Sequence, residues 1–208
     1  MESGQTLERF SASPVGGGVG VTAEISRTHP LRRLFGDLVE RRYGEDLHLR
    51  DTQVSGYVAN MLTDFTHTDN LCRIRNAAGR RLDEVADILV ESNPLLAASS
   101  FERERAVRKH IGDFTLFFLG MFPEHVAWRK GAGLRLDFML DFVQAGKESY
   151  TIVSAFDQCE YRQVAPLFKN VADQFELCVF GLNLVRQDLE RFQRDYMDSL
   201  RKHTAPAA

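Results

Sequence analysis

The sequence predicts an all-α protein: a single-domain helical bundle of six or seven helices, with a long C-terminal helix that carries a heptad pattern. Apolar residues recur three and four positions apart in most segments after residue 29, which is the spacing of one helix face. The only stretch typical of a strand, residues 150–156 (YTIVSAF), has no second strand to pair with. A chain of 208 residues with 44% hydrophobic residues is long enough to fill one core.

We expect three regions along the chain. Residues 1–28 combine Ser, Gly and Pro with little apolar periodicity, which is typical of a flexible N-terminal tail. The GGGVG in this tail departs from GxGxxG and follows no predicted strand, so we do not assign a phosphate-binding loop to it. The all-α helical domain is expected over residues 29–203, followed by a disordered C-terminus over residues 204–208.

The first two helices have clear start signals. Pro30 suits the first turn of a helix that ends near Gly44, and Asp51 suits the N-cap of the next one. The second helix repeats apolar residues at i, i+3, i+4, i+7, i+8 and i+11: Val54, Tyr57, Val58, Met61, Leu62 and Phe65. A polar connection with four arginines follows over residues 67–81, and we interpret it as a solvated loop rather than a nucleic-acid site.

The middle of the chain predicts three more helices. A short one begins near Leu82 and breaks before Pro94. Ser99 and Glu102 form a capping box for the next, which starts amphipathic, becomes apolar all round and ends at Pro123. Such a helix passes from the surface into the centre of a bundle. A third covers residues 136–156, where Gly146 leaves room for a close neighbour.

The C-terminal segment carries the most regular pattern, with apolar spacings that alternate between four and three. A helix from Pro166 to Lys202 would be about 55 Å long at 1.5 Å per residue. We call its apolar line the seam: Val164, Phe168, Val171, Phe175, Cys178, Leu182, Val185, Leu189, Phe192 and Tyr196. A seam of this length either forms the central helix of the bundle or projects to pair with a second copy.

Composition excludes several classes of function. A formal net charge of −3 argues against nucleic-acid binding. Three cysteines without CxxC spacing indicate neither a disulfide framework nor a zinc site, and fit a reducing cytoplasm. The longest apolar run, residues 116–122, is far below the roughly 20 residues that span a membrane. We therefore expect a cytoplasmic protein with no cofactor, no nucleic-acid partner and no membrane partner.

Paired Asp and His residues are the main candidates for a binding site. His110 and Asp113 share a helix face, and Asp64 and His67 repeat the spacing in reverse order. Facing helices would bring two imidazoles and two carboxylates together, but bundle metal sites use Glu-x-x-His pairs with further glutamates. We assign no catalytic residue and no metal ligand. The candidate ligand-binding residues are His110, Asp113, His67, Asp64 and Tyr150.

Four blocks carry a resemblance: YVANMLTDFTHTDNL, VRKHIGDFTLFFLGMFPE, DFVQAGKESYTIVSAFD and APLFKNVADQFELCVFGLNLVR. In this order they resemble a widespread family of uncharacterised bacterial proteins of similar length, from about residue 30 to residue 189. The resemblance implies a bacterial, cytoplasmic, single-domain helical protein and transfers no functional residue.

Two hypotheses of function follow from the sequence. The first is a non-enzymatic helical interaction or scaffolding module, which forms a homo-oligomer through the long C-terminal helix or binds another protein. The alternative is a helical bundle that binds a metal or a small ligand through the paired Asp and His residues on facing helices. This alternative includes the case in which the protein is an enzyme.

Overall fold

A computed structural model describes Ser26 and residues 28–71, 101–124 and 135–204. In these ranges the chain forms helices and turns and no strand, which confirms the all-α prediction. The predicted tail up to residue 25, the short helix after Leu82 and the end of the chain lie outside the described residues. The seven α-helices in those ranges are α1 (Pro30–Arg41), α2 (Thr52–Asp64), α3 (Thr68–Leu71), α5 (Phe101–Met121), α7 (Arg135–Ala155), α8 (Ala165–Asp173) and α9 (Phe175–Thr204).

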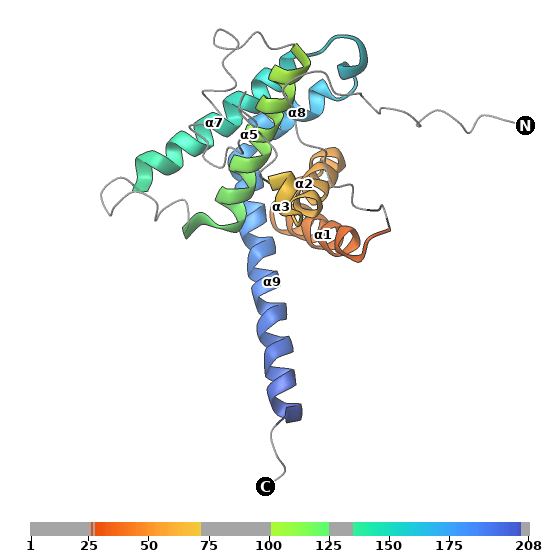
Figure 1. Ribbon diagram of the computed structural model, residues 1–208, viewed down its shortest axis with the longest axis vertical. Helices are drawn as coiled ribbons and strands as arrows, with labels where there is room; N and C mark the ends of the chain where they lie inside the picture. Colours follow the sequence, from red (N-terminus) through yellow and green to blue (C-terminus); the bar gives the residue numbers. More distant parts are fainter. Residues whose placement is uncertain (1–25, 27, 72–100, 125–134, 205–208) are drawn as a thin grey trace, which may run out of the picture.

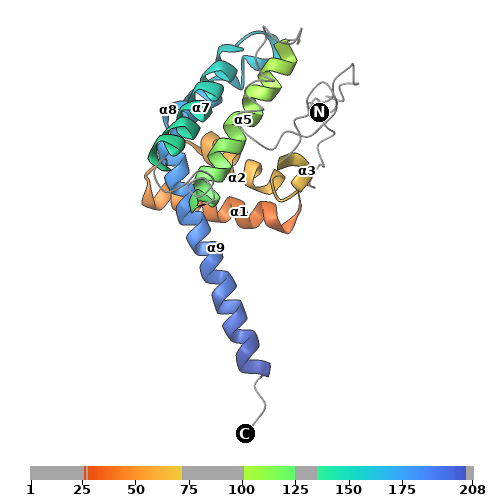
Figure 2. The same ribbon diagram turned by 60° about the vertical axis from the view of Figure 1, so that its left-hand side comes forward.

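The helices gather around the first half of α9 (Figures 1 and 2). α5 and α7 run side by side, and α8 lies along α7. α1 and α2 form a hairpin that closes through a π-helical turn, η1 (Arg42–Asp46), and contacts α9. The second half of α9 extends away from all of these elements in both views.

The start signals of the first two helices are confirmed, whereas Ser99 of the predicted capping box lies outside the described residues. Pro30 occupies the first turn of α1, and the His29 ring accepts a hydrogen bond from the Leu31 backbone N–H at 3.3 Å. The Asp51 carboxylate accepts from the backbone N–H groups of Gln53 and Val54 at 2.9 and 3.2 Å. Local capping chemistry thus fixes where both helices begin.

Three glycines let aromatic rings reach the helix backbone, and the first confirms the close neighbour expected at Gly146 of α7, where a Cβ would overlap the Phe175 ring of α9. A Cβ at Gly112 of α5 would overlap the Tyr150 ring of α7, and a Cβ at Gly181 of α9 would overlap the Tyr43 ring of η1. Tyr43 also donates a 2.7 Å hydrogen bond from its hydroxyl to the Cys178 carbonyl. Gly181 therefore allows η1 to lie close against α9.

The single helix predicted from Pro166 to Lys202 is wrong in one respect, because the structure divides it at Gln174. The backbone there has φ −111° and ψ 21°, outside the helical region, and helical hydrogen bonding resumes from Cys178 to Gln174. α8 lies against α7, whereas α9 packs mainly against α5. The thirty residues of α9 span about 45 Å.

Candidate functional site: the projecting end of α9

The last part of α9, residues 189–204, is here called the stem. Its side chains from Glu190 to Lys202 are all exposed, whereas the first half of the helix buries its seam residues. Several of them are large and apolar: Phe192 is 47% exposed and Tyr196 65%, and Met197 and Leu200 are also exposed. The stem therefore presents to solvent side-chain types that most of this chain buries in its core.

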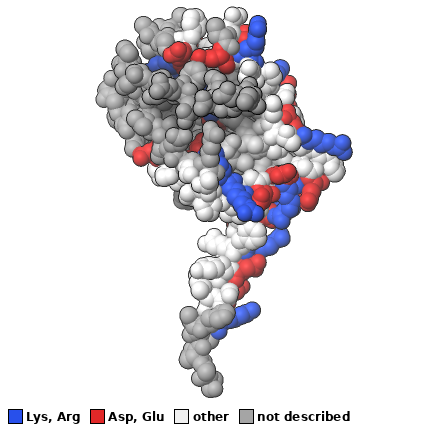
Figure 3. Space-filling model, turned by 90° about the vertical axis from the view of Figure 1, so that its right-hand side faces the viewer, with Lys and Arg blue, Asp and Glu red and all other residues white. Residues whose placement is uncertain are grey.

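The exposed apolar residues continue a line that begins inside the core. The seam residues Phe175, Cys178, Leu182 and Val185 have no solvent exposure. The helices α1 to α8 and the first half of α9 are here called the body. Leu189 is half-buried at its edge, and Phe192 and Tyr196 lie beyond it on the same face of the helix. Figure 3 shows an uncharged face along the stem, with Lys, Arg, Asp and Glu on the opposite side. One periodic surface is thus covered by the body for half its length and uncovered for the rest.

A buried carboxylate holds α9 where the stem leaves the body. Asp188 is 2% exposed, and its Oδ2 accepts from Arg41 Nη2 at 2.7 Å and from Arg42 Nε at 2.8 Å. Arg42 also pairs with Asp46 within η1 at 2.8 Å. The Arg42 hydrogen bond, aided by Arg41, lowers the pKa of Asp188 to about 2. Two guanidiniums on one buried carboxylate fix the base of the stem to the α1–α2 hairpin.

A second buried carboxylate, Asp113 of α5, joins three helices. It accepts hydrogen bonds from Lys109 Nζ at 2.7 Å, from the Tyr150 hydroxyl of α7 at 2.8 Å, and from the Tyr57 hydroxyl of α2. Burial, together with the charge of Asp113, raises the pKa of Tyr150 well above its usual value. Tyr150 therefore stays protonated and acts as a hydrogen-bond donor, so the contact serves to join the helices.

The structure brings together only some of the predicted site residues. Asp113 and Tyr150 are hydrogen-bonded, and His110, one turn before Asp113, is buried between the rings of Phe65 and Phe114 with centroids 6.0 Å away in both cases. Among the residues that the structure describes, no group of three or more His, Cys, Asp or Glu side chains is arranged to hold a metal ion.

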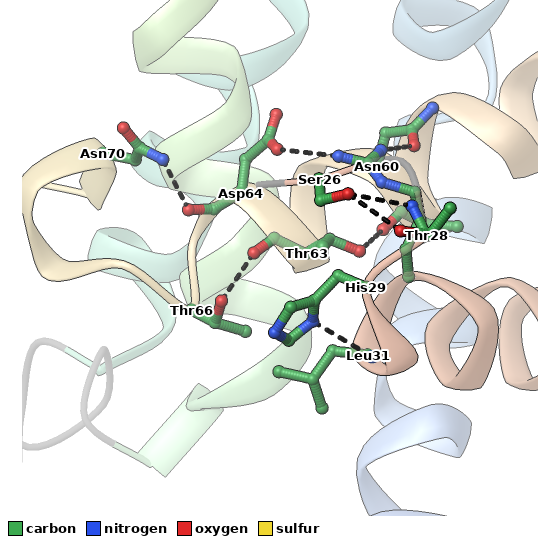
Figure 4. Close-up of polar contacts among 11 residues, drawn as sticks. Ser26, Thr28, His29, Leu31, Asn60, Thr63, Asp64, Thr66 and Asn70 are labelled. Carbon is green, nitrogen blue, oxygen red and sulfur yellow. Dashed lines mark hydrogen bonds and ion pairs between the residues drawn. The ribbon is translucent and has the colours of Figure 1, made fainter. Parts of the chain in front are cut away.

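Asp64 and His67 lie at the exposed end of α2. Asp64 is 51% exposed, and its carboxylate pairs with Arg32 of α1 at 3.6 Å. Its main-chain carbonyl accepts from Asn70 at 2.9 Å (Figure 4) and from the His67 backbone N–H at 3.3 Å. These contacts close the end of α2 and link it to α1.

Two other features bear on chemistry. Burial raises the pKa of the Cys178 thiol to about 12, so this cysteine is a poor nucleophile. A hollow of about 440 Å³ opens between α1 and α2 and includes none of the five candidate residues. It is lined by Gly36, Glu40, Gly44, Leu49, Arg50, Thr52, Ser55, Gly56 and Ala59.

Sequence reasoning identified the seam but missed Asp188 and its two arginines. Asp188 lies beside the seam at a position that usually faces solvent, and nothing within the helix pairs with it. Arg42 lies 146 residues earlier in the chain, and only the fold brings it to Asp188.

Comparison with protein-family models, with curated proteins and with solved structures gave no match. Within the described ranges, no helix combines the length and the apolar character that crossing a membrane requires.

Proposed function

We propose that this protein is a non-enzymatic helical interaction module, and that its binding surface is the apolar face of the stem. The observation that carries the proposal is the continuity of the seam from the core into solvent at Leu189. The body is a scaffold that fixes the direction of the stem through Asp188 and Gly181.

The exposed seam favours association on energetic grounds. Burial of a Phe or Leu side chain contributes about 1.5–3 kcal/mol, and heptad-patterned helices realise this gain by pairing. A contiguous row of large apolar side chains on a monomer surface commonly marks an interaction site. Phe192 and Tyr196, at successive seam positions, would form the centre of that contact.

A second copy of this chain is the partner that the stem fits best. The charged side of the stem carries both signs, with Glu190, Asp195 and Asp198 interspersed among four basic residues: Arg191, Arg194, Arg201 and Lys202. Such a surface selects neither a strongly acidic nor a strongly basic partner, and an identical mixed-charge helix is compatible with it. The proposed assembly is therefore a homodimer.

The alternative of a ligand-binding bundle has less support. Asp113, its strongest candidate, already accepts hydrogen bonds from three side chains of its own fold. That pattern is typical of a carboxylate that stabilises a core boundary.

Sedimentation of the full chain over a dilution series tests the proposal. We expect the mass to rise from that of one chain, 23.6 kDa, toward twice that value as concentration rises through the micromolar range. A mass of one chain at every concentration would contradict it.

A further inference from the structure

The hollow between α1 and α2 is lined by no residue of α9, so it is separate from the stem. We propose, independently of how the stem associates, that this hollow binds a small zwitterion: an α-amino acid with an apolar side chain, whose carboxylate pairs with Arg50 and whose ammonium group pairs with Glu40. The volume of the hollow is about 440 Å³. Cavities of roughly 300–1,000 Å³ are typical of sites for small molecules.

Glycines keep this hollow open. The structure describes seven glycines, and four of them lie so close to a side chain of the fold that an added Cβ would overlap it. At the other three, Gly36, Gly44 and Gly56, an added Cβ meets nothing within 4 Å in the described part of the chain, and all three line the hollow. Glycine weakens a helix relative to alanine. Close packing accounts for the first four glycines, whereas the approach of a ligand to the backbone accounts for these three.

Two side chains of opposite charge line the hollow, and the fold neutralises neither. Glu40 of α1 and Arg50, which lies just before α2, are exposed, and neither makes a hydrogen bond or an ion pair with the described residues. By contrast, Arg41 and Arg42, which follow Glu40, both pair with Asp188. Glu40 and Arg50 are therefore available to bind charged groups of a ligand.

This pair of charges distinguishes between classes of ligand. Among the described residues that line the hollow, Arg50 is the one cation and Glu40 the one anion. Glu40 would repel a phosphate, and one carboxylate is too few for a metal site. An apolar molecule would cover both charges without pairing them. A molecule that carries one ammonium and one carboxylate group pairs with both.

The other lining residues fit the remaining parts of an amino acid. The planar guanidinium of Arg50 offers parallel N–H donors that match a carboxylate. The Ser55 hydroxyl donates to the Asp51 carbonyl at 3.2 Å, so its oxygen can still accept from an ammonium group. Leu49 and Ala59 are buried and supply apolar surface at the bottom of the hollow, which favours an apolar ligand side chain.

Heteronuclear NMR of the full chain, with the backbone amide signals assigned, locates and measures the binding. The probes are L-leucine, L-methionine and L-phenylalanine, each beside its N-acetyl derivative, which lacks the ammonium group, and its amide, which lacks the carboxylate. We expect saturable shifts of the Gly36, Gly44 and Gly56 amide signals with at least one free amino acid, and binding of both its derivatives weakened by about tenfold or more. The proposal is overturned by equal binding of the derivatives, by shifts confined to other residues, or by no saturable shift with any probe up to about 10 mM.

Four variants connect the binding to the hollow. Arg50→Gln and Glu40→Gln each remove one charge and should weaken binding of the free amino acid by about tenfold or more. Arg33→Gln removes an exposed charge of α1 outside the hollow and should change binding by less than about twofold. Gly56→Leu fills the hollow and should lose binding while its circular dichroism stays that of the wild type, because its Cβ meets nothing within 4 Å.

Unchanged binding by folded Gly56→Leu would overturn the location of the site. Unchanged binding by Arg50→Gln or Glu40→Gln would overturn the pairing with a zwitterion, and these two variants decide the outcome if Gly56→Leu does not fold. None of the four substitutions lies in α9, so the mass of the protein in solution tests the role of the stem separately.

Discussion

The hydroxyl of Tyr150 lies 2.8 Å from the carboxylate of Asp113, and this contact joins α7 to α5 inside the body. Asp113 is nearly inaccessible to solvent, and Tyr57 and Lys109 donate to the same carboxylate. His110 and Asp113, which the sequence suggested as one polar site, therefore have different partners in the fold. Asp113 anchors three helices, whereas His110 packs among aromatic rings.

Replacement of Tyr150 by Phe should lower the free energy of unfolding by about 1.5–3 kcal/mol, because one hydrogen bond to a buried charged group is lost while the ring remains. Urea unfolding followed by circular dichroism measures the change. Thr151→Ala removes an exposed hydroxyl from the next residue of α7 and should change stability by less than about 0.5 kcal/mol. Equal stability of Tyr150→Phe and the wild type would show that the contact contributes nothing.

Replacing glycine by alanine should change the stability in opposite directions at two positions of the fold. Gly112→Ala should destabilise by about 1–3 kcal/mol, because the new Cβ overlaps the Tyr150 ring. Gly56→Ala, in the middle of α2, meets nothing within 4 Å and should stabilise by about 0.5–1 kcal/mol through helix propensity. Thermal melts of the two variants beside the wild type provide the comparison. A gain of stability in Gly112→Ala would contradict the close packing of Tyr150 on α5.

Asp188 should make stability depend on pH in the acid range. Its pKa is about 2 in the folded protein against 3.8 ordinarily, so its contribution is complete above its unfolded pKa and is lost as the pH falls from about 5 to 2. The shift corresponds to about 2 kcal/mol. Urea unfolding of the wild type and Asp188→Asn at several pH values measures the effect. As the pH falls, the free energy of unfolding should decrease more steeply in the wild type than in the variant. Identical slopes would mean that Arg41 and Arg42 do not stabilise the folded carboxylate.

The features that the sequence predicted are those that local chemistry decides. Pro30 and Asp51 mark helix starts because capping involves only the next few residues. The arrival of Tyr150 at Asp113 and of Arg42 at Asp188 depends on packing between distant segments, and no local pattern contains it.

The C-terminal helix shows most clearly what the apolar periodicity of a sequence cannot predict. The break at Gln174 involves neither Gly nor Pro, so no local sequence signal predicts it. The same heptad spacing serves the buried residue Val185 and the exposed residue Tyr196, because a core and a helix pair require the same periodicity. Only the fold shows where the body ends and the stem begins.

Light scattering on two matched variants tests the role of the stem most directly. Phe192→Glu places a charge on the exposed seam, whereas Phe180→Glu places it at a Phe of the same helix that is 54% exposed and lies off the seam. We predict a mass of one chain for Phe192→Glu, and twice that mass for Phe180→Glu and the wild type at the same concentration. A dimer that survives Phe192→Glu, or that is lost equally in both variants, would contradict the assignment of the stem as the interaction surface.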